Sequence, residues 1–143
     1  MKKLYYAAAA YMVLGLAGGL FYRELTKAND FSGDTELAVV HTHLLVLGMT
    51  VFLILIVLEA TVGLTGSRLF PWFFWIYNAG LVVTVGLMAV IGSMTVLGQP
   101  VGAALAGIAG LGHILLTVAL VLFFLGLHGR LFPRGQQEHA DAD

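Results

Sequence analysis

The chain has 143 residues, of which 59% are hydrophobic and only 10% are charged, and its mean hydropathy is +0.94. A soluble domain carries about 25% charged residues, so this composition places the chain among membrane proteins. The net charge of −1 gives no indication of a nucleic-acid partner. The chain has no cysteine, which excludes disulfides, thiolate metal ligands and a cysteine nucleophile.

Four apolar segments are each long enough to cross a bilayer, which takes about 20 helical residues. The first covers residues 4–22, and it is longer than the apolar part of a signal peptide, which favours a retained helix. The second covers residues 37–64. No Asp, Glu, Lys or Arg lies between Arg68 and Arg130, and the turn signal Gly98-Gln99-Pro100 divides this stretch into residues 70–97 and 101–127.

We therefore expect an all-α integral membrane four-helix bundle that forms a single domain over residues 1–143, with a polar tail from 128 to 143. Lysine and arginine predict its orientation in the inner (plasma) membrane. Only Arg23 and Lys27 lie on one side, whereas the other side holds Lys2, Lys3, Arg68, Arg130 and Arg134. This distribution predicts that both termini are cytoplasmic.

Two histidines, His41 and His43, lie near the start of the second segment in an otherwise apolar run. An ionisable group inside a bilayer is costly, so its presence indicates a function. Imidazole is the commonest side-chain ligand of haem iron, copper and zinc. The pattern favours a ligand role for the pair over the alternative that both rings only hydrogen-bond between helices.

The spacing of the pair bears on what it can bind. Residues two apart on a helix point about 200° away from each other, whereas the ligands of a compact zinc site are usually spaced three or four residues apart. His41 and His43 are therefore expected to face different sides of the helix. This arrangement suits a helix wedged between two flat cofactors.

Gly48 and Glu59 return to nearly the same azimuth as His41 further along the helix. A glycine two turns from a histidine leaves room for a planar ring, and close helix packing is an equally good interpretation. For Glu59 an interfacial charge is favoured over a role with protons or ions.

The motif His41-Thr42-His43-Leu44-Leu45, with Gly48, resembles the haem-binding helices of the catalytic subunits of haem-copper oxidases and nitric oxide reductases. The whole chain is similar in length and layout to small bacterial four-helix membrane proteins with the same kind of motif. The large subunit of the oxidase family has twelve helices in three equivalent four-helix arcs. The resemblance implies that one chain corresponds to one arc and that three copies form a homotrimer.

The same resemblance implies that haem b lies between two protomers, with His41 of one protomer and His43 of its neighbour as the ligands of the metal. Bis-histidine ligation leaves iron without an open position, which favours electron transfer or storage over substrate chemistry. The chain has no second histidine pair for a copper centre and no cross-link tyrosine pattern. Oxygen reduction and proton pumping are therefore not expected.

Two further residues are candidates for the cofactor site. His113, in the fourth segment, is a candidate axial ligand from the same subunit, although helix packing or hydrogen bonding is favoured. Arg23 lies on the same side as His41, where it could bind a haem propionate or serve equally well as an interfacial anchor. His128 is interpreted as interfacial, and His139 has no expected role.

Several other residues are expected to have structural roles. Asp34 is a candidate cap for the second segment, and Asn78 and Thr84 are expected to form interhelical hydrogen bonds. Aromatics at the membrane interface are expected at Tyr5, Tyr6, Trp72, Trp75 and Tyr77.

The sequence thus predicts a haem b-binding membrane protein of cytochrome b type, for electron transport or for sensing a gas such as nitric oxide or oxygen. Its expected partners are other copies of the chain, membrane lipid, and a redox partner or quinol. No residue pattern identifies an enzyme. The alternatives are a protein that handles copper or zinc through His41 and His43, with or without His113, and a non-catalytic accessory subunit.

Overall fold

The computed structural model describes residues 1–132, apart from the side chains of Ala103, Ala106 and Ala109, and all the regular secondary structure in this range is helical. The first helix is α1 (Lys2–Ala28). A second, continuous rod consists of α2 (Leu37–His43), the segment η1 (Leu44–Thr50) and α3 (Val51–Val62). The short turn η2 (Leu64–Gly66) leads into α4 (Phe70–Val96), and α5 (Ala103–Leu131) follows.

Within the described residues, four helices are long and apolar enough to cross a membrane, judged by length and composition. They cover Lys2–Ala28, Leu37–Val62, Phe70–Val96 and Gly110–Leu131. The expected all-α fold with four membrane-length helices is therefore confirmed. The chain therefore has the helix lengths and the composition of a multi-pass membrane protein.

Two helices continue beyond their expected ends because polar side chains support the extra turns. α1 runs to Ala28 instead of residue 22, and Thr26 Oγ1 donates a 2.9 Å hydrogen bond to the carbonyl oxygen of Tyr22. Residues 128–131, expected to begin the polar tail, are the last turn of α5, where Arg130 Nε donates to the carbonyl oxygen of Val62 at 3.1 Å. Residues 133–143, with Arg134 and His139, lie outside the described part of the chain.

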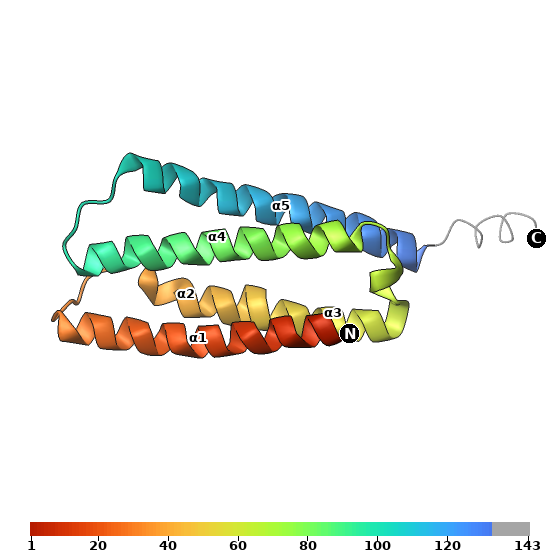
Figure 1. Cartoon of the computed structure of the whole chain (residues 1–143), viewed down its shortest axis with the longest axis horizontal. Helices are drawn as coiled ribbons and strands as arrows, with labels where there is room; N and C mark the ends of the chain where they lie inside the picture. The colour runs from red at the N-terminus through yellow and green to blue at the C-terminus, as the bar shows by residue number, and fades with distance from the viewer. Residues whose placement is uncertain (133–143) are drawn as a thin grey trace, which may run out of the picture.

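The four rods lie side by side in the order α1, α2–α3, α4, α5, and each runs antiparallel to the next (Figure 1). α5 packs along α4 and touches η2, whereas α1 packs on the second rod. α1 and α5 therefore form the two edges of an open arc, and the expected four-helix bundle does not close on itself. The first residues of α1 and the last residues of α5 lie at the same end of the arc.

We name the two ends of the arc by their residues. The histidine end is formed by residues 29–36 and 97–102, and it is the end nearer to His41 and His43. The arginine end is formed by residues 63–69 together with Arg130.

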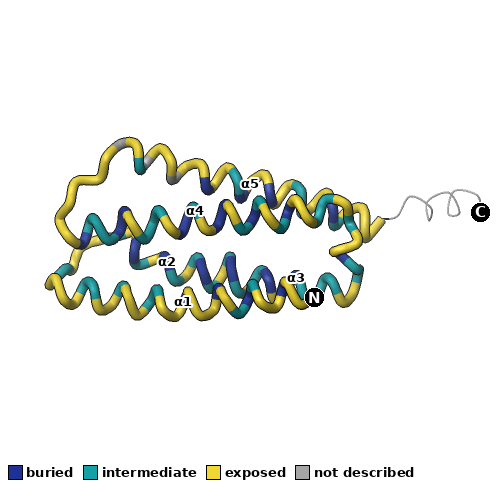
Figure 2. The backbone as a smooth tube through the Cα atoms, in the orientation of Figure 1, coloured by how far each residue is buried: buried dark blue, intermediate teal, exposed yellow. Residues whose placement is uncertain are grey.

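The buried residues lie on the facing sides of α1, the second rod, α4 and α5 (Figure 2). The centre of this core is aromatic. Phe52 is fully buried, with its ring centroid 5.7 Å from that of Tyr11 and 6.0 Å from that of Tyr77. The outward faces are apolar and exposed, which suits helices surrounded by lipid tails.

Small residues allow close approach where the second rod begins. A Cβ on Gly92 of α4 would overlap the backbone nitrogen of Leu37. Thr35 Oγ1 donates to the carbonyl oxygen of Gly92 at 2.8 Å and accepts from the backbone nitrogen of Leu37 at 3.3 Å. The expected cap by Asp34 is therefore wrong: the N-cap residue of α2 is Glu36, which makes no side-chain cap hydrogen bond, and it is Thr35 that reaches both α4 and the first turn of α2.

Candidate functional site

His41 lies on the side of α2 that faces α1. A Cβ built on Gly19 would lie 3.7 Å from both Cβ and Cγ of His41, so the histidine packs over a small-residue surface of α1. The Nδ1 atom of His41 is buried and has no hydrogen-bond partner among the described residues. Its Nε2 lies 3.4 Å from Thr42 Oγ1, which is long for a hydrogen bond. The two ring nitrogens of His41 therefore form few hydrogen bonds within their own chain. An unpaired buried polar atom costs about 1–3 kcal/mol.

His43 is the last residue of α2, and its ring orientation is fixed by the backbone. His43 Nδ1 lies 2.9 Å from the carbonyl oxygen of Val39. Because a carbonyl oxygen only accepts, Nδ1 must carry the proton, and the neutral ring then presents its lone pair at Nε2. Metal-binding histidines are commonly held by such a bond from the second ring nitrogen. His43 therefore has the tautomer of a ligand that binds metal through Nε2, and the hydrogen bond at Nδ1 holds its ring in place.

The two rings lie on different sides of the rod, as their spacing predicts. Between them runs a buried stripe made of Leu37, Val40 and Leu44. A pocket of about 510 Å³ at the histidine end is lined by Val39, by Ile91 and Thr95 of α4 and by Tyr22 of α1, and neither histidine lines it. One helix therefore does not direct both histidines at one small ligand.

No group of three or more histidine, cysteine, aspartate or glutamate side chains that could hold a metal ion occurs within residues 1–132. An apolar groove of about 390 Å³ lies between α1 and α4 over Val40 and Leu44, and neither histidine lines it. A flat cofactor that contacts His41 or His43 would therefore approach from outside this groove.

The backbone changes register immediately after His43. Residues Leu44–Thr50 form a π-helix, and the backbone nitrogen of Val51 bonds to the carbonyl oxygen of Val46, five residues back. π turns are rare and are frequently found at functional sites. The sequence analysis assumed an α-helix throughout and did not predict this change.

Gly48 is buried and faces α1, the same side as His41. A Cβ on Gly48 would lie 2.5 Å from Cγ and 2.6 Å from Cβ of Tyr11. The open space for a planar ring that we considered at Gly48 is therefore filled by the Tyr11 phenol ring. Helix packing explains this glycine, and the interpretation of Gly48 as a cofactor-binding residue is corrected.

His113 lies on an exposed part of α5, and its carbonyl oxygen accepts a 2.9 Å hydrogen bond from Thr117 Oγ1. α4 stands between α5 and the second rod (Figure 1). The fold of one chain therefore does not bring His113 to the histidine pair.

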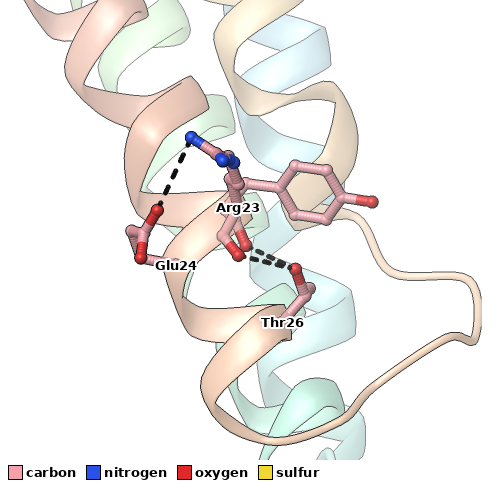
Figure 3. A network of polar contacts seen from close by, with 4 residues as sticks. Arg23, Glu24 and Thr26 are labelled. Carbon is pink, nitrogen blue, oxygen red and sulfur yellow. Dashed lines mark hydrogen bonds and ion pairs between the residues drawn. The ribbon is translucent and has the colours of Figure 1, made fainter.

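Arg23 lies on α1 at the histidine end, one turn beyond Gly19 and therefore on the side of His41. Its side chain is 73% exposed, and Nη1 lies 3.9 Å from Glu24 Oε1 (Figure 3). An exposed ion pair contributes only about 0–1 kcal/mol. The guanidinium group is therefore readily available to another carboxylate near His41.

Glu59 has a structural role at the arginine end. Its Oε2 accepts from the backbone nitrogen of Thr65 at 2.7 Å, and its Oε1 accepts from Thr65 Oγ1 at 2.5 Å. The guanidinium group of Arg130 packs against Gly63 and Gly66 in the same loop. These contacts favour the interpretation of Glu59 as an end-of-helix charge.

Some residues differ from their expected roles. Tyr77 is only 1% exposed and donates a 2.8 Å hydrogen bond to the carbonyl oxygen of Leu47, so its interpretation as an interface aromatic is wrong. Asn78 does form an interhelical hydrogen bond, with the hydroxyl of Tyr11. Thr84 is buried against Gly112, but its hydroxyl has no partner within the described residues. Hydropathy could not separate Tyr77 from the exposed Trp72 and Trp75, since all three lie in one aromatic run.

The fold and the site define an all-α protein with four membrane-length helices and a histidine pair on the second. The chain belongs to the family described as "Protein of unknown function (DUF2871)", whose model matches residues 1–130. No curated protein and no solved structure matches the chain. The resemblance to haem-copper oxidases therefore depends on the histidine motif and the helix layout alone.

Proposed function

We propose that this protein binds haem b in the inner (plasma) membrane through His41 and His43 and transfers electrons. The observation that carries the proposal is the 2.9 Å hydrogen bond from His43 Nδ1 to the carbonyl oxygen of Val39, which leaves the Nε2 lone pair for iron. The unpartnered, buried Nδ1 of His41 supports the same role, because the ring of His41 finds little hydrogen bonding within its own chain.

The opposed rings favour a site shared between two copies of the chain. His41 packs over Gly19 of α1, and residues two apart on a helix point about 200° away from each other, which argues against both rings of one protomer binding one haem. His41 of one protomer and His43 of its neighbour are the proposed axial ligands. The open arc leaves two edges, α1 and α5, for neighbouring copies, and the proposed assembly is a homotrimer.

In the proposed orientation both termini are cytoplasmic and the histidine end faces outward. Arg23 then lies at the outer end of α1, where its guanidinium can pair with a propionate in bidentate fashion. The apolar helix faces exclude water from the site. Haem would supply one-electron chemistry, and two histidine ligands leave no open position, which favours electron transfer with a quinol or another redox partner over gas sensing.

The first test is the reduced-minus-oxidised visible spectrum of the protein purified in mild detergent. We expect a sharp low-spin b-type spectrum that is lost in His41→Ala and His43→Ala and retained in His113→Ala and His128→Ala. Loss in His113→Ala would move the site inside one protomer. A colourless wild-type protein that stays free of haem after haem is added would overturn the proposal and leave copper or zinc handling, or an accessory role.

A mixed assembly tests whether two copies share the haem. Chains carrying His41→Ala and chains carrying His43→Ala each lack one ligand, but their mixture contains contacts at which both ligands are intact. Co-expression should therefore restore part of the spectrum that each variant lacks alone. If both ligands came from the same chain, the mixture would stay colourless.

A further inference from the structure

The π segment leaves one backbone carbonyl without its usual partner. In an α-helix the carbonyl oxygen of Leu47 would accept from the backbone nitrogen of Val51. In this structure the nitrogen of Val51 bonds instead to the carbonyl oxygens of Val46 and Gly48. The backbone nitrogen that would serve the carbonyl oxygen of Leu47 in an α-helix is therefore used elsewhere, within the apolar part of the rod.

Tyr77 of α4 supplies the missing donor. Its hydroxyl donates a 2.8 Å hydrogen bond to the carbonyl oxygen of Leu47. The Tyr77 ring is held between Phe52 and Phe73, with ring centroids 6.0 and 5.4 Å away. Because a buried carbonyl oxygen without a donor is costly, this contact stabilises the π register over the α register.

The π segment lies between two parts of the rod that are fixed independently. On the histidine side, Thr35 bonds to the carbonyl oxygen of Gly92, and Leu37 packs directly on that glycine. On the other side, Phe52 is fully buried in the aromatic core. A turn closed by a bond five residues back encloses one more residue than an α turn, so the π segment accommodates one extra residue between the two fixed parts.

We propose that Tyr77 is a positioning residue: its hydroxyl holds the π register of Leu44–Thr50 and thereby sets His41 and His43 relative to α3. The consequence for ligand geometry rests on the proposed haem function. The register itself does not, and it can be measured on the protein without haem.

A double-mutant cycle tests the register. Deletion of Val46, whose side chain is 50% exposed, removes one residue from the π segment and returns the Leu47 carbonyl oxygen to the backbone nitrogen of Val51. Tyr77→Phe in the wild-type chain should lower the melting temperature by about 4 °C. In the chain lacking Val46, the same substitution should have no effect or raise the melting temperature, because the carbonyl oxygen of Leu47 then accepts from the backbone nitrogen of Val51 and no longer depends on the Tyr77 hydroxyl.

The matched control is Tyr11→Phe, which removes a buried hydroxyl whose acceptor is the side chain of Asn78. Its effect should be the same with and without Val46. An equal loss from Tyr77→Phe in both backgrounds would overturn the proposal, because the hydroxyl would then stabilise something other than the π register.

A distance measurement covers the case in which the deletion variant does not fold. The chain has no cysteine, so spin labels on Val39→Cys and Val57→Cys report directly on the two sides of the π segment. Both positions are exposed. Tyr77→Phe should shift or broaden the distance between these labels, whereas an unchanged distance would overturn the proposal.

The haem spectrum separates the two proposals. If the wild-type protein binds haem, Tyr77→Phe should change its low-spin absorption or electron paramagnetic resonance signature, whereas Tyr11→Phe should not. An unchanged signature would overturn the positioning role at the histidines. If the wild-type protein binds no haem, the proposed function fails, and the melting cycle and the label distance still decide the role of Tyr77 in the register.

Discussion

The hydroxyl of Tyr11 on α1 donates a 2.7 Å hydrogen bond to Oδ1 of Asn78 on α4. Nδ2 of Asn78 donates in turn to the carbonyl oxygen of Phe74 at 2.7 Å. α1 and α4 pack on different sides of the second rod, and the hydrogen bond between Tyr11 and Asn78 joins them directly. The bond fixes the curvature of the arc at the level of the aromatic core.

Removing the acceptor should destabilise the protein measurably. Asn78→Ala leaves the buried hydroxyl of Tyr11 without a partner, and we expect a loss of about 1 kcal/mol in the free energy of unfolding. Thermal unfolding in detergent measures it. The double variant Tyr11→Phe/Asn78→Ala should lose less than the sum of the single losses, and strict additivity would contradict the pairing.

Gly48 and Gly86 both lie within helices, so alanine substitutions at the two positions can be compared directly. Gly48→Ala places a methyl group 2.5 Å from Tyr11 Cγ, so we expect a loss of about 1–3 kcal/mol from overpacking. Nothing lies within 4 Å of the same methyl group on Gly86, and Gly86→Ala should be neutral or stabilise the helix by about 0.5–1 kcal/mol. Equal melting temperatures for the two variants would contradict the close contact at Gly48.

Two variants of Glu59 can show whether this residue acts as a structural hydrogen-bond acceptor or carries protons. Glu59→Gln keeps one oxygen for Thr65, so it should cost less stability than Glu59→Ala, for which we expect about 1 kcal/mol. Both variants should keep the haem spectrum proposed for the wild-type protein. If both variants melted like the wild type, the structural role would be contradicted and a proton or ion role favoured.

The proposed orientation can be tested because the chain has no native cysteine. Ser32→Cys and Gln99→Cys lie in exposed loops at the histidine end, and Arg68→Cys lies in an exposed loop at the other end. A membrane-impermeant maleimide applied to intact cells should label the first two variants only. Arg68→Cys should react only after the membrane is opened, and the reverse pattern would invert the topology.

Hydropathy and charge predicted the membrane-length helices because lipid exposure demands long apolar runs, which are visible in any single sequence. The same runs hide which face of each helix is buried. Tyr77 and Trp75 belong to one aromatic cluster, yet Tyr77 is in the core and Trp75 faces outward. Hydropathy alone could not predict the open arc, because a helix that faces lipid and a helix that faces a neighbour are equally apolar, and only the resemblance to the oxidase subunit implied an arc.

The candidate site was only partly predictable for a related reason. The spacing of His41 and His43 placed them on different sides of one helix, which follows from helix geometry alone. The hydrogen bond of His43 to Val39 and the glycine surface beside His41 depend on side-chain packing. The role of Gly48 could not be predicted without the position of Tyr11, which lies on another helix, 37 residues earlier in the chain.

The even number of long helices brings the first residues of α1 and the last residues of α5 to the same end of the arc (Figure 1). Copies of this chain could therefore be concatenated into one polypeptide by linkers that never cross a bilayer. In such a tandem polypeptide each repeat would be free to diverge, and one repeat could keep His41 while another kept His43. Symmetric units of this shape can thus become one asymmetric subunit by gene duplication, with no change in how any helix enters the membrane.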